Sequence, residues 1–279
     1  MIRIGPAGTG MDAISGLNYI AKLGLTALEV EFTHGVRMSN ETAVEVGKLA
    51  KQLNIALSIH APYYINLASK EKKKIEESKK RILDSCERGH NMHAKYVVFH
   101  AGFYQERNKE EVFQIIKDEI LDLQKKIKQK SWNIILAPET TGKLSQFGDL
   151  GELLRLKKET DCHLCIDFAH LKARNNGKID LKEIFDKIMH IGHIHSHFSG
   201  INYTEKGEKN HIPIDINEVK VLATEMIKIA KSRRFLACSE SVFGTDSDIK
   251  KRKLDITIIN ESPDTINDAV KIKEIFEKI

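Results

Sequence analysis

The sequence has few of the features that mark disulfide-stabilised, membrane-spanning or disordered proteins. Only four of its 279 residues are cysteines, which is too few for a disulfide framework, so we expect reduced thiols. No apolar run approaches the roughly 20 residues that cross a bilayer. The start, MIRIGPAGTG, lacks the basic and apolar regions of a signal peptide. We therefore expect a cytoplasmic protein without a membrane partner.

Proline and glycine are also scarce. Five prolines and 17 glycines argue against long disordered linkers, and 41% hydrophobic with 30% charged residues is typical of a compact globular protein. The formal net charge of +5 permits binding to a polyanion without requiring it. Lysine-rich stretches such as KEKKKIEESKKR lie in helical patterns mixed with glutamate and indicate solvated helix faces.

Strand-like runs alternate with amphipathic helical patterns, as in proteins built from repeated βα units. The predicted strands are IRIG (2–5), ALEVEF (27–32), IALSIHA (55–61), KYVVFHA (95–101), NIILAPE (133–139), HLCIDFA (163–169), IGHIHSHF (191–198) and DITIINE (255–261). The predicted helices lie near 11–23, 40–52, 70–92, 108–130, 147–159, 180–188, 215–232 and 265–278. Eight such pairs predict an α/β protein with a (β/α)8 TIM barrel in a single domain, 1–279, and an open doubly wound sheet is the alternative.

One segment breaks this alternation. Residues 235–254, FLACSESVFGTDSDIKKRKL, stand between the last two helical patterns, where a short loop would normally suffice. We expect an insertion before the last strand, and the run FLACSE is an alternative candidate for the eighth strand.

Side chains that bind metals recur where the predicted strands end, on the face that would point into the barrel. These residues are His60, His100, Glu139, Asp167 with His170 three residues later, His195 and Glu261. The loops at this end of a TIM barrel carry the chemistry. Several buried carboxylates and imidazoles around one barrel mouth are costly unless they are paired or bind cations.

This set of ligands exceeds what one ion needs, so it predicts more than one metal ion. Histidine, aspartate and glutamate without cysteine favour Zn²⁺, with Mn²⁺ as a possible substitute. Closely spaced ions can stabilise both the attacking and the leaving oxygen of a displacement at phosphorus. Hydrolysis of a phosphoester is therefore the predicted chemistry.

Seven short motifs resemble, in the same order, those of the endonuclease IV family: SIHAPYYINLAS, VVFHAGF, APETTG, CIDFAHLKA, HIHSHFSG, KNHIPI and INESP. Members of that family are apurinic/apyrimidinic endonucleases built on a TIM barrel with three zinc ions. The resemblance implies a zinc-dependent hydrolase of base excision repair that cleaves double-stranded DNA 5′ to an abasic site. It also implies that His60 and His100 bind one ion, while Glu139 bridges to the next and orients or deprotonates the attacking water.

The remaining ligands follow from the same resemblance. Asp167, His195 and Glu261 would complete the second site, and His170 would belong to the third. His211, in KNHIPI, matches the remaining histidine of the family. Two or three zinc ions per chain are thus expected.

One position departs from the family pattern. The family usually has an aspartate two residues before the position of His211, where this chain has Lys209. A lysine cannot replace a carboxylate ligand. Either Glu208 reaches the third ion in its place, or that ion binds weakly or is absent.

HIHSHFSG places three histidines on one strand face, which the barrel separates by depth. His193 would lie one layer down in a hydrogen-bonded core role. His195 would reach the rim and match the ligand of the family motif. His197 would lie beyond it, where it supports a ligand or contacts a phosphate of the substrate.

The loop after the third strand offers Tyr63, Tyr64 and Asn66. These side chains are suited to hold a sugar–phosphate backbone or to wedge into a duplex beside an extruded abasic nucleotide. The alternative is an active-site loop that is simply packed. We expect the protein to act as a monomer.

Two other functions remain open. The first is a sugar isomerase or epimerase of the xylose isomerase superfamily, in which Glu139, Asp167, His195 and Glu261 would bind one Mn²⁺ or Mg²⁺. A single ion would leave the other strand-end histidines, His60, His100, His170 and His211, with a smaller part in the site. The second is a non-catalytic binder of damaged DNA. Metal content separates the first alternative from the nuclease.

Overall fold

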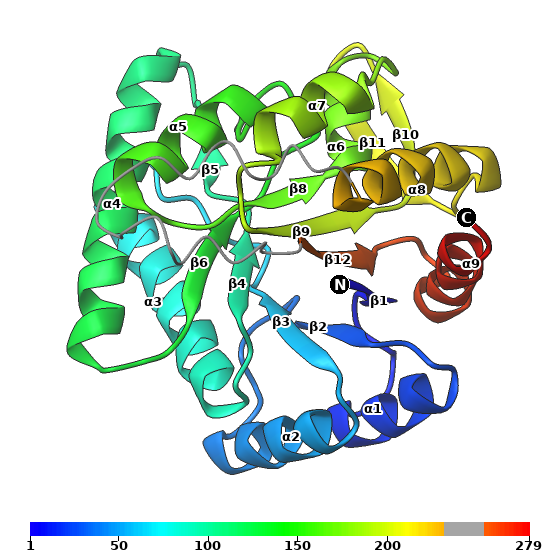
Figure 1. The fold of residues 1–279 in the computed structure, drawn as a ribbon. Helices are drawn as coiled ribbons and strands as arrows, with labels where there is room; N and C mark the ends of the chain where they lie inside the picture. Colours follow the sequence, from blue (N-terminus) through cyan, green and yellow to red (C-terminus); the bar gives the residue numbers. More distant parts are fainter. Residues whose placement is uncertain (232–253) are drawn as a thin grey trace, which may run out of the picture.

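A computed structural model describes residues 1–231 and 254–279. Eight parallel strands form a barrel with helices packed around its outside (Figure 1). The barrel strands are β1 (Ile2–Pro6), β2 (Ala27–Glu31), β3 (Ala56–His60), β4 (Tyr96–Phe99), β6 (Ile135–Pro138), β8 (Cys165–Asp167), β9 (His193–Phe198) and β12 (Asp255–Asn260). All eight coincide with predicted strands, so the predicted TIM barrel is confirmed.

The barrel closes from two four-stranded parallel halves. One half has the order β2, β3, β4, β6 and the other has the order β8, β9, β12, β1. A single parallel bridge between Ala7 and Glu29 joins the halves on one side, and a bridge between Glu139 and Cys165 joins them on the other. An open doubly wound sheet would have no such second junction.

The helices in the described part of the chain follow the predicted pattern closely. They are α1 (Ala13–Lys22), α2 (Asn40–Gln52), α3 (Lys72–Asn91), α4 (Lys109–Gln129), α5 (Leu150–Thr160), α6 (Phe168–Arg174), α7 (Leu181–Ile188), α8 (Ile216–Lys231) and α9 (Thr265–Lys278). Several begin at a capping side chain. Asp149, for example, accepts a hydrogen bond from the Glu152 backbone N–H, and the Glu152 carboxylate accepts one from the Asp149 backbone N–H.

The strands separate two kinds of interior. Outward-facing residues such as Leu28 and Val30 join the large apolar core between the strands and the helices. Tyr96, Val98 and Cys165 belong to a small separate cluster that fills the barrel itself. Alternate residues of a strand point to opposite faces, so the polar residues between the apolar ones face the barrel axis.

Two additional pieces of structure were not predicted. A hairpin of β10 (Gly200–Thr204) and β11 (Gly207–Ile212) follows β9, and a short ladder joins β5 (Gly102–Phe103) to β7 (Gln146–Phe147). Helix α6 also went unpredicted because it starts directly at the end of β8. Asp167 ends that strand and caps the helix by accepting a hydrogen bond from the His170 backbone N–H at 2.6 Å.

Two further predictions concern membrane-spanning segments and the insertion before the last strand. None of the helices within residues 1–231 and 254–279 is both long enough and apolar enough to cross a bilayer. The predicted insertion, 235–254, lies outside the described residues except for Leu254, which is buried. The eighth barrel strand is β12, at the position predicted for it.

Candidate metal centre

The carboxyl ends of the barrel strands surround a pocket of about 550 Å³. Its lining contains eight of the residues that the sequence singled out: His60, Tyr63, His100, Glu139, His170, Glu208, His211 and Glu261. They come from six different strand ends or loops, so the fold brings them together as predicted. The pocket is therefore the candidate functional site.

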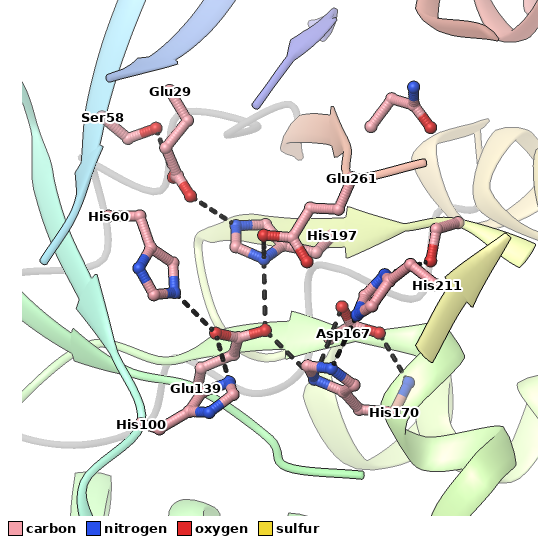
Figure 2. Close-up of polar contacts among 12 residues, drawn as sticks. Glu29, Ser58, His60, His100, Glu139, Asp167, His170, His197, His211 and Glu261 are labelled. Carbon is pink, nitrogen blue, oxygen red and sulfur yellow. Dashed lines mark hydrogen bonds and ion pairs between the residues drawn. The ribbon is translucent and has the colours of Figure 1, made fainter. Parts of the chain in front are cut away.

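Glu139 lies at the centre of these groups (Figure 2). Its Oε2 atom is 3.3 Å from Nε2 of His60 and 3.1 Å from Nε2 of His100. Its Oε1 atom is 3.2 Å from Nδ1 of both His170 and His197. The side chain is fully buried. Because the two oxygens face different histidine pairs, this carboxylate is placed to bridge two cations.

Backbone carbonyls orient two of the histidines. Nδ1 of His60 donates a hydrogen bond to the Ala61 carbonyl at 2.8 Å, and Nδ1 of His170 donates to the Thr140 carbonyl at 2.9 Å. A carbonyl only accepts, so each Nδ1 carries a proton and Nε2 is the nitrogen that is left to bind a cation. Such partners fix the tautomer and the ring orientation of metal-binding histidines.

Glu139, Asp167, His197 and Glu261 form a group whose ligand atoms all lie within 4.8 Å of one another. Nδ1 of His197 is 3.0 Å from Oε1 of Glu261. Oδ2 of Asp167 is buried and has no hydrogen-bond partner in residues 1–231 and 254–279. Its nearest cationic neighbour is Nδ1 of His170 at 3.5 Å. A buried carboxylate oxygen without a hydrogen bond is costly, and a bound cation would supply the missing interaction. The donor set fits zinc.

A third group consists of His170, Glu208 and His211. The Nε2 atoms of the two histidines are 3.2 Å apart, and Glu208 lies 3.5 Å from Nε2 of His170 and 3.9 Å from Nε2 of His211. Glu208 therefore lies close enough to both histidines to take the part of the aspartate in the family motif. Lys209 is exposed and takes no part in this group.

A β-bulge explains how Glu208 reaches this group. In the hairpin, Asn202 pairs with Asn210 and Tyr203 pairs with Glu208, so Lys209 is the extra residue of the bulge. Residues three apart on a regular strand point to opposite faces, but one bulged residue between them restores the same face. The bulge therefore gives Glu208 and His211 the common face that a regular Asp-x-His spacing would give.

Gly142 makes room for the Glu208 side chain. A Cβ atom at this position would lie 2.6 Å from the Glu208 Cβ and 2.9 Å from its Oε2. The Glu208 backbone N–H also donates to the Gly142 carbonyl at 3.0 Å. The loop after β6 thus forms a cradle that holds Glu208 beside His170.

The β9 histidines follow the expected order of depth, but His197, and not His195 as expected, lies level with Asp167. In the parallel register, Asp167 pairs with His197, whereas His195 pairs with Cys165 one layer deeper. His197 therefore joins Asp167 and Glu261, and His195 instead lies 3.0 Å from Oε2 of Glu29. His193 forms hydrogen bonds with Tyr96 and Thr257, as expected of a core histidine.

The loop after β3 fulfils its expected role only in part. Tyr63 lines the pocket and is 60% exposed. Tyr64 is exposed but does not line the pocket. The Asn66 Oδ1 atom accepts hydrogen bonds from the Ala68 and Phe103 backbone N–H groups. Asn66 thus braces the loop through Oδ1 and does not line the pocket, so its contact with a substrate stays a prediction.

Two acidic residues of the site were missed. Glu29 and Glu31 lie on β2 and form a close group with Glu261. Burial and the charges of Glu29 and Glu261 raise the pKa of Glu31 to about 8. The alternation of apolar and acidic residues in ALEVEF was the available signal, because it turns both carboxylates toward the barrel axis.

The carboxylates dominate the electrostatics of the pocket. Burial alone would lower the pKa of His60, but Glu31 and Glu139 raise it to about 10. Burial likewise opposes ionisation of Glu261, yet His197 lowers the pKa of that carboxyl to about 2. Burial raises the pKa of Asp167 to about 6. A strongly negative field of this kind favours divalent cations in place of protons.

Known proteins resemble the chain at the level of sequence. Residues 17–230 match a family model described as xylose isomerase-like TIM barrel. An uncharacterised protein of Methanocaldococcus jannaschii is 36% identical over 244 residues, which cover 83% of this chain and 88% of that protein. A probable endonuclease 4 of Mesomycoplasma hyopneumoniae is 30% identical over 118 residues, which cover 40% of this chain and 41% of that protein.

Solved structures share the fold. Endonuclease IV from Thermus thermophilus superimposes with a TM-score of 0.68 at 17% identity, over 99% of this chain and 100% of that one. A D-tagatose 3-epimerase-like protein gives a TM-score of 0.66 at 22% identity, over 99% of this chain and 96% of that one. Nuclease and epimerase barrels are therefore both similar to this chain, and the distinction between them lies in the site.

Proposed function

Because the chain belongs to the xylose isomerase-like TIM barrel family, we propose that it is a zinc-dependent phosphodiesterase that cleaves DNA 5′ to abasic sites. One observation carries this proposal: three ligand groups adjoin one another around Glu139 and His170. A single ion would use only one of these groups. Two or three ions are the arrangement suited to displacement at a phosphate.

The protein's own groups have distinct parts in this reaction. When bound, closely spaced zinc ions would lower the pKa of water and neutralise charge on a phosphate. Glu139, which reaches both histidine pairs, orients the attacking water and accepts its proton. Lys143 lines the same pocket and offers a positive charge to a phosphate oxygen. Tyr63, at the pocket edge, presents an aromatic ring to the space left by the missing base.

The test is incision of a duplex that contains one synthetic abasic site, with and without EDTA. We expect one cut 5′ to the site, lost with EDTA and restored by zinc. His197→Ala and Glu261→Gln should abolish incision in a folded barrel. His190→Ala removes an exposed histidine outside the pocket and is the matched control. Absence of incision at every zinc or manganese concentration, from folded and metal-loaded protein, would refute the proposal.

A single-metal sugar epimerase is the second candidate. It is favoured by the group of Glu139, Asp167, His197 and Glu261, which by itself supplies four ligands for one ion. In that case one exchangeable Mn²⁺ per chain should suffice for turnover of a ketose. Two or three zinc ions per chain, with incision of abasic DNA, would favour the nuclease.

A further inference from the structure

A buried carboxylate lies beneath the metal centre, inside the barrel. Glu29 on β2 has no exposed surface. Its Oε2 atom accepts a hydrogen bond from the Ser58 hydroxyl at 2.6 Å and lies 3.0 Å from Nε2 of His195. Ser58 and His195 belong to two other strands and are themselves buried. Glu29 is therefore held from two directions.

The other oxygen of Glu29 faces the metal centre. Oε1 lies 2.8 Å from Nε2 of His197 (Figure 2). This is an ion-pair contact, and neither atom has a hydrogen-bond partner within residues 1–231 and 254–279. Nδ1 of the same ring lies 3.0 Å from Glu261 and 3.2 Å from Glu139. The imidazole thus stands between Glu29 and the ligand group.

This arrangement has a specific chemical consequence. A buried histidine that binds a cation through one nitrogen carries a proton on the other, and this N–H needs an acceptor. A carboxylate acceptor there fixes the tautomer, holds the ring and makes the ligating nitrogen more basic. In His197 the nitrogen that faces the ligand group is Nδ1, so the proton belongs on Nε2, beside Glu29.

We propose that Glu29 is the positioning residue of the metal centre: it accepts the Nε2–H of His197 and so directs Nδ1 at a cation held with Asp167 and Glu261. Glu29 lies outside all seven sequence motifs. The inference rests on the proposed function because it requires a metal centre. It concerns the affinity of one ion and not the identity of the substrate.

The experiment measures binding of Zn²⁺ and Co²⁺ alone, without DNA, to the wild-type chain and to Glu29→Gln. Glutamine keeps the size and an oxygen that can accept from His197, but it removes the charge. We expect one ion to bind about 10- to 100-fold more weakly, with the other ions unchanged. The visible absorption of Co²⁺ at that one site should also change, and circular dichroism should show an intact barrel.

Asp268→Asn is the matched control. Asp268 is another fully buried carboxylate, and it accepts hydrogen bonds from the Ser262 hydroxyl and the Ile214 backbone N–H, outside the pocket. Its loss should leave the affinity for metal unchanged, because it belongs to none of the ligand groups. Equal losses in the two variants would show a general effect of charge and overturn the proposal. So would unchanged affinity in folded Glu29→Gln.

A second variant keeps the inference testable if Glu29→Gln does not fold. Ser58→Ala removes one hydrogen bond to Glu29 and should lower the affinity for the same ion by up to about 5-fold. Unchanged affinity in Ser58→Ala would then overturn the inference. Failure of the proposed function looks different: the metal affinities would follow these expectations while abasic DNA stayed intact. Incision together with unaltered affinities would refute only the role of Glu29.

Discussion

The third ligand group offers the sharpest test of the metal centre, because it depends on a bulge and not on a motif. Glu208 is the only carboxylate in the group with His170 and His211, and it lies 3.5 Å from Nε2 of His170. Glu208→Gln should therefore release one zinc ion selectively. Loss of a carboxylate that merely supports a ligand weakens metal binding about 10- to 100-fold. Loss of a ligand itself should cost at least about 100-fold, or about 2.7 kcal/mol.

Three further variants separate the carboxylate from the bulge. Lys209→Ala should leave the affinity unchanged, since that side chain is exposed. Deletion of Lys209 removes the bulged residue and leaves Glu208 two positions before His211, which should preserve the site. Gly142→Ala should lower the affinity for this ion without removing a ligand, because the new Cβ would lie 2.6 Å from the Glu208 Cβ.

The assay is zinc content by mass spectrometry after dialysis against buffered free zinc, followed by competition with a chelating dye. The expected pattern is loss of one ion in Glu208→Gln, a smaller loss of affinity in Gly142→Ala and no change in Lys209→Ala. If Glu208→Gln retained the wild-type number of ions at wild-type affinity, the bulge argument would be wrong. A third ion lost only on mutation of Lys209 would contradict it equally.

Three other predictions follow from particular side chains. His197→Ala should lose one zinc ion per chain while His195→Ala keeps the full number, and the reverse result would restore His195 as the ligand first expected. Tyr63→Ala should weaken binding of the abasic duplex by about 1–3 kcal/mol, measured by fluorescence anisotropy in EDTA, whereas Tyr64→Ala should have a smaller effect since it does not line the pocket. Burial opposes ionisation of Asp268, but its hydrogen bonds and Lys271 lower its pKa. Asp268→Asn should therefore reduce the free energy of unfolding by about 1–3 kcal/mol at pH 7. That difference should vanish as the pH falls below about 4, through the lowered pKa of the folded state.

The strand ends could be predicted because two simple periodicities meet there. Alternation along each strand indicates which residues face the barrel axis, and the parallel order of βα units puts all carboxyl ends on one side. His60, His100, Glu139 and Asp167 needed nothing more to be placed together. The same reasoning applied to ALEVEF would have found Glu29 and Glu31.

The depth of a side chain in the barrel, and the strand face on which it lies, were harder to predict because both depend on neighbouring strands. A shift of two residues keeps a side chain on the same face but moves it by one layer, so β9 alone cannot distinguish His195 from His197. The pairing of Asp167 with His197 decides the question, and that register is set by packing between strands. The place of Glu208 could not be predicted for a related reason, since a bulge changes which residues share a face.

Closure of the barrel and binding of metal involve the same residues, which leads to a final prediction. His60 and Glu139 belong to one half of the barrel, whereas Asp167, His197 and Glu261 belong to or follow strands of the other. Each junction has one β-bridge, at Glu29 and at Glu139, and a few further backbone hydrogen bonds, so the junctions are shorter than the ladders within each half. A cation held between the halves would stabilise the folded chain by about 2.7 kcal/mol at a free concentration 100 times its dissociation constant. EDTA should lower the melting temperature accordingly and accelerate amide exchange at the two junctions, where Gly8 N–H donates to Glu29 and Thr140 N–H donates to Cys165. Equal acceleration at the interior pair of β3 and β4 would show that metal removal loosens the whole fold, contrary to this reasoning.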